Sequence, residues 1–214
     1  MGILESGPLG PFRKRVGPVV GRKHMGQNVI MSDYHTSNKP GSTGQLESRS
    51  RLGMLNSFLT DISWLVNPGF ARYAKKKSAL NAAFSFNYPN AFVVENNVLQ
   101  INYPAIVFSR GDIVSASGPE TFRQTNSVLF TWLAQPQSVY CQFTDKASFL
   151  ICNSSKHQVV IADRAVDRHL LTYTLDLPED FEGDTLHCYL SFSSADGKLP
   201  GNSGYAGILN GVAT

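Results

Sequence analysis

Hydrophobic residues recur at two different spacings, and the change from one to the other divides the chain. In residues 46–66, apolar side chains follow one another at steps of three and four, which is the spacing of one face of an α-helix. These side chains are Leu52, Leu55, Leu59, Ile62 and Val66. The pattern predicts a helix that ends at the following Asn-Pro-Gly.

Residues 68–87 show the helical spacing again, with Pro68 suited to the first turn. The apolar face consists of Phe70, Tyr73, Leu80, Ala83 and Phe84. The three lysines at 75–77 lie mostly off this face. We expect residues 43–88 to form a helical hairpin whose two apolar faces need a further surface to cover them.

From residue 89 onward the spacing changes to two, with turn signals every 8 to 12 residues. The expected strands cover residues 91–96, 98–109, 127–134, 138–145, 147–154, 157–166, 170–177, 184–194 and 204–212. Trp132 is expected in the core, and His187 on the solvent-facing side of its strand. The predicted class is α+β, in which residues 89–214 form an antiparallel, immunoglobulin-like β-sandwich.

The first 42 residues are rich in glycine, proline and basic side chains. Prolines at 8, 11 and 18 exclude a regular helix. Residues 15–23 and 27–34 have strand character and flank a turn-like His-Met-Gly, so a β-hairpin is expected. Residues 35–45 have the composition of a loop. We interpret residues 1–42 as a basic extended arm.

Charge is scarce and unevenly distributed. Charged residues make up 16% of the chain, against about 25% in typical soluble proteins. Residues 1–80 hold twelve Lys/Arg and four Asp/Glu, a net +8, so the remainder carries −5. This asymmetry favours contact with a polyanion or with an acidic patch on a neighbouring subunit. The candidate contact residues are Arg13, Lys14, Arg15, Arg22, Lys23, Arg49, Arg51, Lys75, Lys76 and Lys77.

No segment has the pattern of a catalytic or cofactor site. Residues 17–24, GPVVGRKH, lack the glycine spacing and the Gly-Lys-Ser/Thr ending of a phosphate loop, and Pro18 removes a backbone N–H. The five histidines are scattered, and no serine has a nucleophile-elbow context. We therefore predict no catalytic residues, no metal, no cofactor and no enzymatic activity.

Other short motifs have simple interpretations. Arg110-Gly111-Asp112 is expected to be a turn between strands rather than an adhesion signal. Asn153-Ser154-Ser155 fits a glycosylation acceptor only on a secretory route. Three cysteines at 141, 152 and 188 are expected as buried thiols, with a Cys141–Cys152 pair across a hairpin as the alternative.

The sequence shows neither a signal peptide nor an apolar run approaching 18 residues. The chain is thus expected to be made in the cytoplasm without a membrane span.

Several blocks together resemble a known family. They are SGPLGPFRKRVGPVVGRKHMGQNVI, the helical segment through NYPNAF, SRGD, LFTW, TDKASFLICN and the segment from LPEDFEGD to GYAGIL. This order is similar to the uncharacterised Bacteroidota family DUF6266.

The more specific matches to that family are Gly69, Phe70, Tyr73, Ala74, Lys75, Gly183, Asp184, Tyr189, Phe192, Ser194, Asp196, Gly197, Ser203, Tyr205 and Gly207. The chain departs from the family at two places. Trp-Lys-Gly is usual where this chain has His24-Met25-Gly26, and the family's basic Pro-Arg-Thr loop is reduced here to KPGSTGQ. The resemblance implies the two-part layout and supplies no catalytic residues.

These observations favour a non-enzymatic structural protein that forms a homo-oligomer or larger assembly. The most concrete form is a capsid-type virion subunit of a small phage or integrated element, whose basic arm contacts nucleic acid or neighbouring subunits. The reason for this assignment is an analogy, since small virus and phage capsid subunits have the same layout of a β-sandwich body and a basic arm. The alternative is an immunoglobulin-like binding module that recognises a surface glycan or a protein.

Overall fold

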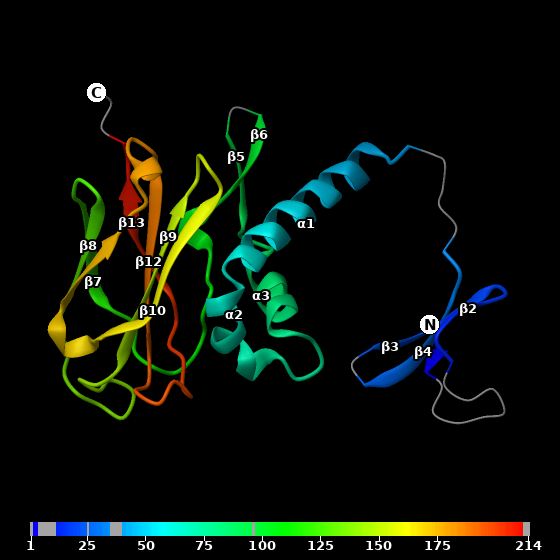
Figure 1. Ribbon diagram of the computed structural model, residues 1–214, viewed down its shortest axis with the longest axis horizontal. Helices are drawn as coiled ribbons and strands as arrows, with labels where there is room; N and C mark the ends of the chain where they lie inside the picture. Colours follow the sequence, from blue (N-terminus) through cyan, green and yellow to red (C-terminus); the bar gives the residue numbers. More distant parts are fainter. Residues whose placement is uncertain (1, 4–11, 25, 35–39, 96, 212–214) are drawn as a thin grey trace. The chain divides into compact units, whose positions relative to one another are not determined.

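The computed structural model describes residues 2–3, 12–24, 26–34, 40–95 and 97–211. The chain divides into two compact units, Met1–Leu46 and Glu47–Thr214. All pairings between named strands in the described residues are antiparallel, and three α-helices follow the first sheet (Figure 1). The predicted α+β class is confirmed at this level, while the immunoglobulin-like sandwich stays a prediction.

The N-terminal unit contains a four-stranded sheet in the order β1-β4-β3-β2. Its strands are β1 (Gly2–Ile3), β2 (Lys14–Val16), β3 (Val19–His24) and β4 (Gln27–Ser32). Strands β3 and β4 form the predicted hairpin, with His24 paired to Gln27. Gly17, with φ of 57°, turns the chain between β2 and β3.

The described side chains of this sheet form very little hydrophobic core. Val29, 3% exposed, is the single buried hydrophobic side chain among the described residues of the N-terminal unit. Val16 and Tyr34 are exposed. Phe12 lies against Gly21, where a Cβ would collide with the Phe12 carbonyl and ring. A sheet this small is marginally stable in water without a covering surface.

Three α-helices occur where two were predicted: α1 (Thr43–Asp61), α2 (Ser63–Gly69) and α3 (Ala79–Asn87). The prediction of a single helix over residues 68–87 was wrong in its first half. There the chain makes a 3₁₀ turn, η1 (Ala71–Tyr73), and then an exposed run of lysines. The hydroxyl of Ser78 accepts the amide of Asn81 and caps α3 at its later start.

The second unit contains three sheets, in the orders β10-β9-β12-β13, β11-β8-β7 and β5-β6. Their strands are β5 (Phe92–Glu95), β6 (Val98–Ile101), β7 (Ser117–Arg123), β8 (Ser127–Leu133), β9 (Lys146–Asn153), β10 (Gln158–Asp167), β11 (Thr172–Asp176), β12 (Leu186–Ser193) and β13 (Gly204–Leu209). Strands β9 and β12 are the interior strands of the four-stranded sheet.

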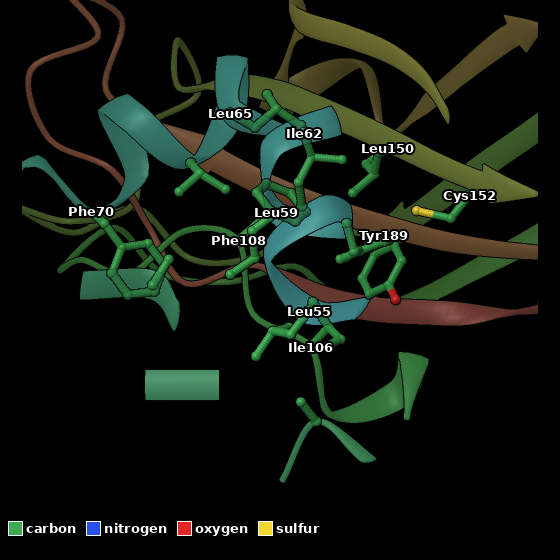
Figure 2. Packing of buried hydrophobic residues seen from close by; sticks show 14 of the residues in the cluster. Leu55, Leu59, Ile62, Leu65, Phe70, Ile106, Phe108, Leu150, Cys152 and Tyr189 are labelled. Atoms are coloured by element: carbon green, nitrogen blue, oxygen red, sulfur yellow. The ribbon is translucent and has the colours of Figure 1, made fainter. Parts of the chain in front are cut away.

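One face of the four-stranded sheet is covered by the helices. Leu59 of α1 and Ile62, which directly follows α1, belong to the same buried cluster as Leu150 of β9 and Tyr189 of β12 (Figure 2). Leu59 and Ile62 are both fully buried. The amphipathic stripe recognised in the sequence therefore finds its covering surface within the same unit.

The other face of this sheet shares a second buried cluster with the three-stranded sheet. Phe130 and Trp132 of β8 meet Phe149 of β9 and Phe192 of β12 there. Trp132 is thus a core residue, as predicted, and its Nε1 donates to the carbonyl of Arg168 at 2.9 Å. Strands β9 and β12 are consequently buried on both faces.

Residues 138–145, expected as a strand, form a loop that carries a buried ion pair. Asp145 and Arg168 have side chains only 2% and 4% exposed, with Nε and Oδ2 3.2 Å apart. Arg168 also donates to Gln135 and to the carbonyl of Val114, and its guanidinium lies 3.7 Å from the centre of the Phe192 ring. An unpaired buried charge would be costly, and these bonds compensate the charge of Arg168. They also tie three loops to the core.

Truncation of the helical layer at its centre should destabilise the second unit. We expect Leu59→Ala to lower the free energy of unfolding by about 2–5 kcal/mol, because the fully buried side chain leaves a cavity against the sheet. Leu52→Ala on the same helix is the matched control, since Leu52 is 56% exposed; its effect should stay within about 0.5 kcal/mol. Urea unfolding followed by fluorescence measures both, and equal effects would contradict the described packing.

Candidate functional site

A groove runs along one edge of the helical layer of the second unit. It consists of two adjoining cavities of about 760 and 520 Å³. Four residues line both cavities: Asp61, His157, Gln158 and Val159. The larger cavity lies between α1, β6 and the turn from β9 to β10, and the smaller continues to the 3₁₀ turn η4 (Glu179–Phe181).

The groove has an apolar floor and a polar rim. Phe58 and Cys152, both buried in the first hydrophobic cluster, contribute to the floor. The rim carries hydroxyl, amide, imidazole and carboxylate groups: Ser50, Ser57, Asp61, Ser154, Ser155, His157, Gln158 and Asp180. An apolar floor with a few polar groups at the rim is the usual construction of a binding site.

The protonated groups near the floor are held neutral by burial. Burial raises the pKa of the Cys152 thiol well above its usual range and that of Tyr103 to about 12. A nucleophilic thiol needs a lowered pKa, so Cys152 is unsuited to that chemistry. Cys141, Cys152 and Cys188 are all buried free thiols, as predicted, and the alternative Cys141–Cys152 pairing does not occur.

His187 is buried, and the prediction that it faces solvent was wrong. Its ring is stacked on Tyr103, with centroids 4.0 Å apart, and its Nδ1 lies 2.9 Å from the Tyr205 hydroxyl. Alternation along β12 correctly places His187 on the opposite face from Leu186 and Cys188. It does not show that η2 (Tyr103–Ala105) covers that opposite face, which is the source of the error. Burial lowers the pKa of His187 to about 4.

The groove is electronegative. Among the described residues, its lining contains the two carboxylates of Asp61 and Asp180 and neither Lys nor Arg. A lining of this sign repels phosphate groups and attracts cationic side chains. Within the described segments, no three His, Cys, Asp or Glu side chains come together in a way that suits a metal ion.

The basic residues predicted as contacts do not line this groove. Arg13, Lys14, Arg15, Arg22 and Lys23 are all exposed in the N-terminal unit. The strand register pairs Lys14 with Gly21 and Arg15 with Val20, so alternation divides the charges between both faces of the sheet. Arg15 is also engaged within the unit, 2.7 Å from Asp33.

The remaining predicted contacts lie in the second unit. Arg49 and Arg51 are on α1, where Arg51 pairs with Glu47 one turn away and lies 5.7 Å from the Phe92 ring. The lysines at 75–77 are exposed between η1 and α3. The structure thus does not gather the ten predicted residues into one patch within either unit.

Arg110-Gly111-Asp112 joins the helices to the sheets. Arg110 lies between the rings of Tyr73 and Phe86, at 4.6 and 4.0 Å, and Asp112 pairs with Arg72. A Cβ at Gly111 would collide with the backbone of the loop that contains residue 200. The tripeptide is a half-buried bend in the connection between η2 and β7, so its role here is packing.

Asn153 also has a structural role. Its side chain is 1% exposed, donates to Asp184 at 2.8 Å and accepts the backbone amides of Ser155 and Lys156. An amide so engaged is not presented for glycosylation. The sequence motif is explained by the turn that it stabilises between β9 and β10.

The buried imidazole should make stability pH-dependent. An unfolded His187 binds a proton near pH 6.5 but the folded one only near pH 4, so stability falls as pH drops through this interval. From pH 7 to 4.5 the wild type should lose about 2 kcal/mol more than His187→Gln, which does not titrate. Urea unfolding of both proteins at the two pH values measures the difference. Parallel losses would show that His187 is not held neutral.

Within the described residues, no helix combines the length and apolar character needed to cross a membrane. No curated protein matches the chain significantly. Residues 11–207 match the family described as a family of unknown function, DUF6266. This match covers most of the chain and reaches into both units; of the blocks that suggested the resemblance, only residues 6–10 and 208–209 lie outside it. The chain therefore belongs to the family of unknown function DUF6266.

Proposed function

We propose that this protein is a non-enzymatic assembly protein, most concretely a capsid-type virion subunit of a small phage or integrated element. In this proposal the second unit supplies the body of the subunit. The basic N-terminal arm contacts nucleic acid or neighbouring subunits. The protein is made in the cytoplasm and is then carried in the particle.

The observation that carries the proposal is how few hydrophobic side chains the described strands of the N-terminal unit bury. Its described strands bury one hydrophobic side chain, Val29, and leave Val16 and Tyr34 exposed. Burial of apolar area is the main stabilising term for a small sheet. An ordered sheet with so little of it is best explained by a surface outside the unit that covers it.

Exposed apolar side chains on the second unit also support self-association. Val139, Phe143 and Leu170 are 82%, 52% and 52% exposed. Phe143 and Leu170 lie near each other in the fold, because the amide of His169 donates to the carbonyl of Phe143. Exposed apolar side chains gathered in this way are typical of surfaces that pack against protein.

The finer fold in the proposal is an immunoglobulin-like sandwich made by the four-stranded and three-stranded sheets. Their shared cluster of buried residues supports it, as do the antiparallel pairings within each sheet. Sandwich bodies with basic N-terminal arms recur in small capsid subunits, and this analogy of layout is the reason for the virion assignment.

The groove gives independent support to the alternative, a binding module for a glycan or a protein. Its apolar floor and hydrogen-bonding rim suit a ligand of either class. This alternative predicts a monomer whose melting temperature rises with ligand, whereas the assembly proposal predicts a mass that depends on protein concentration.

Sedimentation velocity over a range of protein concentrations tests the assembly proposal. We expect species heavier than the 23.4 kDa chain, with a fraction that rises with concentration. The variant R13E/K14E/R22E/K23E should shift the midpoint of association at least about tenfold upward, because charge complementarity at the contact is reversed. A wild type that stays monomeric at millimolar concentration would contradict the proposal.

The matched control is R13K/K14R/R22K/K23R, which keeps every charge and should associate like the wild type. The same proteins, titrated into labelled single-stranded DNA at several salt concentrations, test the nucleic-acid contact. Wild type and control should bind with affinity that falls steeply with salt, and the charge-reversed variant should not bind. Equal binding of the DNA by all three proteins would show that the basic arm does not make the nucleic-acid contact.

A further inference from the structure

Two carboxylates of the groove have no cationic partner within the part of the chain that the structure describes. Asp61, the last residue of α1, and Asp180, in η4, both line the smaller cavity and are exposed. Neither belongs to any of the ion pairs formed by the described residues. Lys156, next in sequence to the lining residue His157, pairs instead with Asp184 at 2.8 Å. Two carboxylates in one cavity create a negative potential that attracts a cation.

The elements that carry the two aspartates add to this potential. Asp61 stands at the C-terminal end of α1, which carries the negative end of the helix dipole, and the last turn of α1 contains no basic residue. On the side of η4, residues 169–197 contain six carboxylates and neither Lys nor Arg. Both sides of the smaller cavity therefore favour a positive charge.

The floor of the groove suits an aliphatic chain. Phe58, Ile101 and Val159 line the larger cavity, which Asp61 also borders. Burial is the main cause of the raised pKa of the Cys152 thiol, and the charge of Asp61 contributes to it, so this carboxylate lies close to the apolar floor. Apolar surface stabilises methylene groups that leave water. The larger cavity, of about 760 Å³, has the size of a small-molecule site.

We propose that the groove binds a small aliphatic diamine or polyamine. Its ammonium groups face Asp61 and Asp180, and its methylene chain lies on the floor beside Phe58 and Val159. Each ammonium group has three N–H donors, and the hydroxyl and amide oxygens of the rim accept those that the carboxylates leave free. The inference goes beyond the proposed assembly, because all described lining residues belong to the second unit of a single chain.

The lining distinguishes this ligand from other classes. A phosphate-bearing ligand would face two carboxylates without a basic side chain among the described lining residues. Ca²⁺ and Mg²⁺ take at least about six ligands, and no three His, Cys, Asp or Glu side chains in the described segments are placed to hold a metal ion. A neutral ligand would use the floor and leave the charges of Asp61 and Asp180 uncompensated.

Isothermal titration calorimetry of the full chain at low salt tests the ligand class. The probes are 1,8-diaminooctane, 1,8-octanediol and suberate, which have chains of similar length and differ in charge. We expect the diamine to bind, and the diol and suberate not to bind. The diamine should bind about tenfold more tightly than 1,4-diaminobutane, because it has more methylene groups to place on the floor. Absence of diamine binding, or equal binding of the diol, would overturn the proposal.

Paired variants test the position of the ammonium groups. D61N/D180N keeps the size of both side chains and should bind the diamine about tenfold more weakly. D61E/D180E keeps both charges and should bind like the wild type. D176N/E182Q removes two exposed carboxylates outside the described lining, so it matches the first variant in net charge and should also bind like the wild type. Equal weakening by D61N/D180N and D176N/E182Q would show non-specific attraction and would contradict the site. Melting followed by circular dichroism separates lost binding from lost folding.

A dibasic peptide separates a small ligand from a segment of a protein. N-acetyl-lysyl-glycyl-lysinamide carries the same charge as 1,8-diaminooctane, but its peptide groups would lose hydrogen bonds to water on the apolar floor. It should therefore bind about tenfold more weakly than the diamine. Equal or tighter binding of the peptide would assign the groove to a basic protein segment and would rule out the proposed ligand. These readouts do not depend on the oligomeric state, so either proposal can fail while the other stands.

Discussion

The structure depends on the burial of one sheet on both faces. Strands β9 and β12 carry apolar side chains on each side, so neither the helices nor the three-stranded sheet can be removed without exposing them. The helices, in turn, have nowhere else in this unit to place their stripe of Leu55, Leu59 and Ile62. The groove is a by-product of this arrangement, because it forms where α1 passes the β9–β10 turn and leaves Asp61 at the rim.

The two units differ in how their order is maintained. The second unit is held by two hydrophobic clusters and by the satisfied buried pair of Asp145 and Arg168. The N-terminal sheet has well-formed hydrogen-bonded pairings, and its described side chains form almost no apolar core. Backbone hydrogen bonds contribute little net stability in water, since the unfolded chain makes them with solvent. This contrast is the basis of the proposed contact between copies.

Hydrophobic spacing was sufficient to predict the class of each region but not its interruptions. Of the predicted stripe, Leu55, Leu59, Ile62 and Val66 are buried, while Leu52 is exposed. The spacing does not show the break between α1 and α2 at Ile62. The late start of α3 coincides with the cap at Ser78, and the caps at Ser42 and Ser78 are visible in the sequence only as isolated serines. Ser42 with Gln45 has the spacing of a capping box, a signal that could have moved the start of α1 to Thr43.

The groove could not be predicted from the sequence, because its lining comes from α1, β6, the β9–β10 turn and η4. The negative charge of the groove was indicated in the sequence only by the absence of Lys and Arg from residues 169–197. Alternation in residues 138–145 was misleading, since Asp145 is buried by its bond to Arg168 rather than by a strand. Pattern alone does not distinguish an apolar loop with a satisfied charge from a strand.

The most direct measurement is amide hydrogen exchange of residues 12–34 at low and high protein concentration. If another molecule covers this sheet, as proposed, protection of the β3–β4 amides should rise with concentration while that of β9 and β12 stays constant. Protection of the N-terminal sheet that is equally strong at every concentration, in a protein shown to be monomeric, would contradict it.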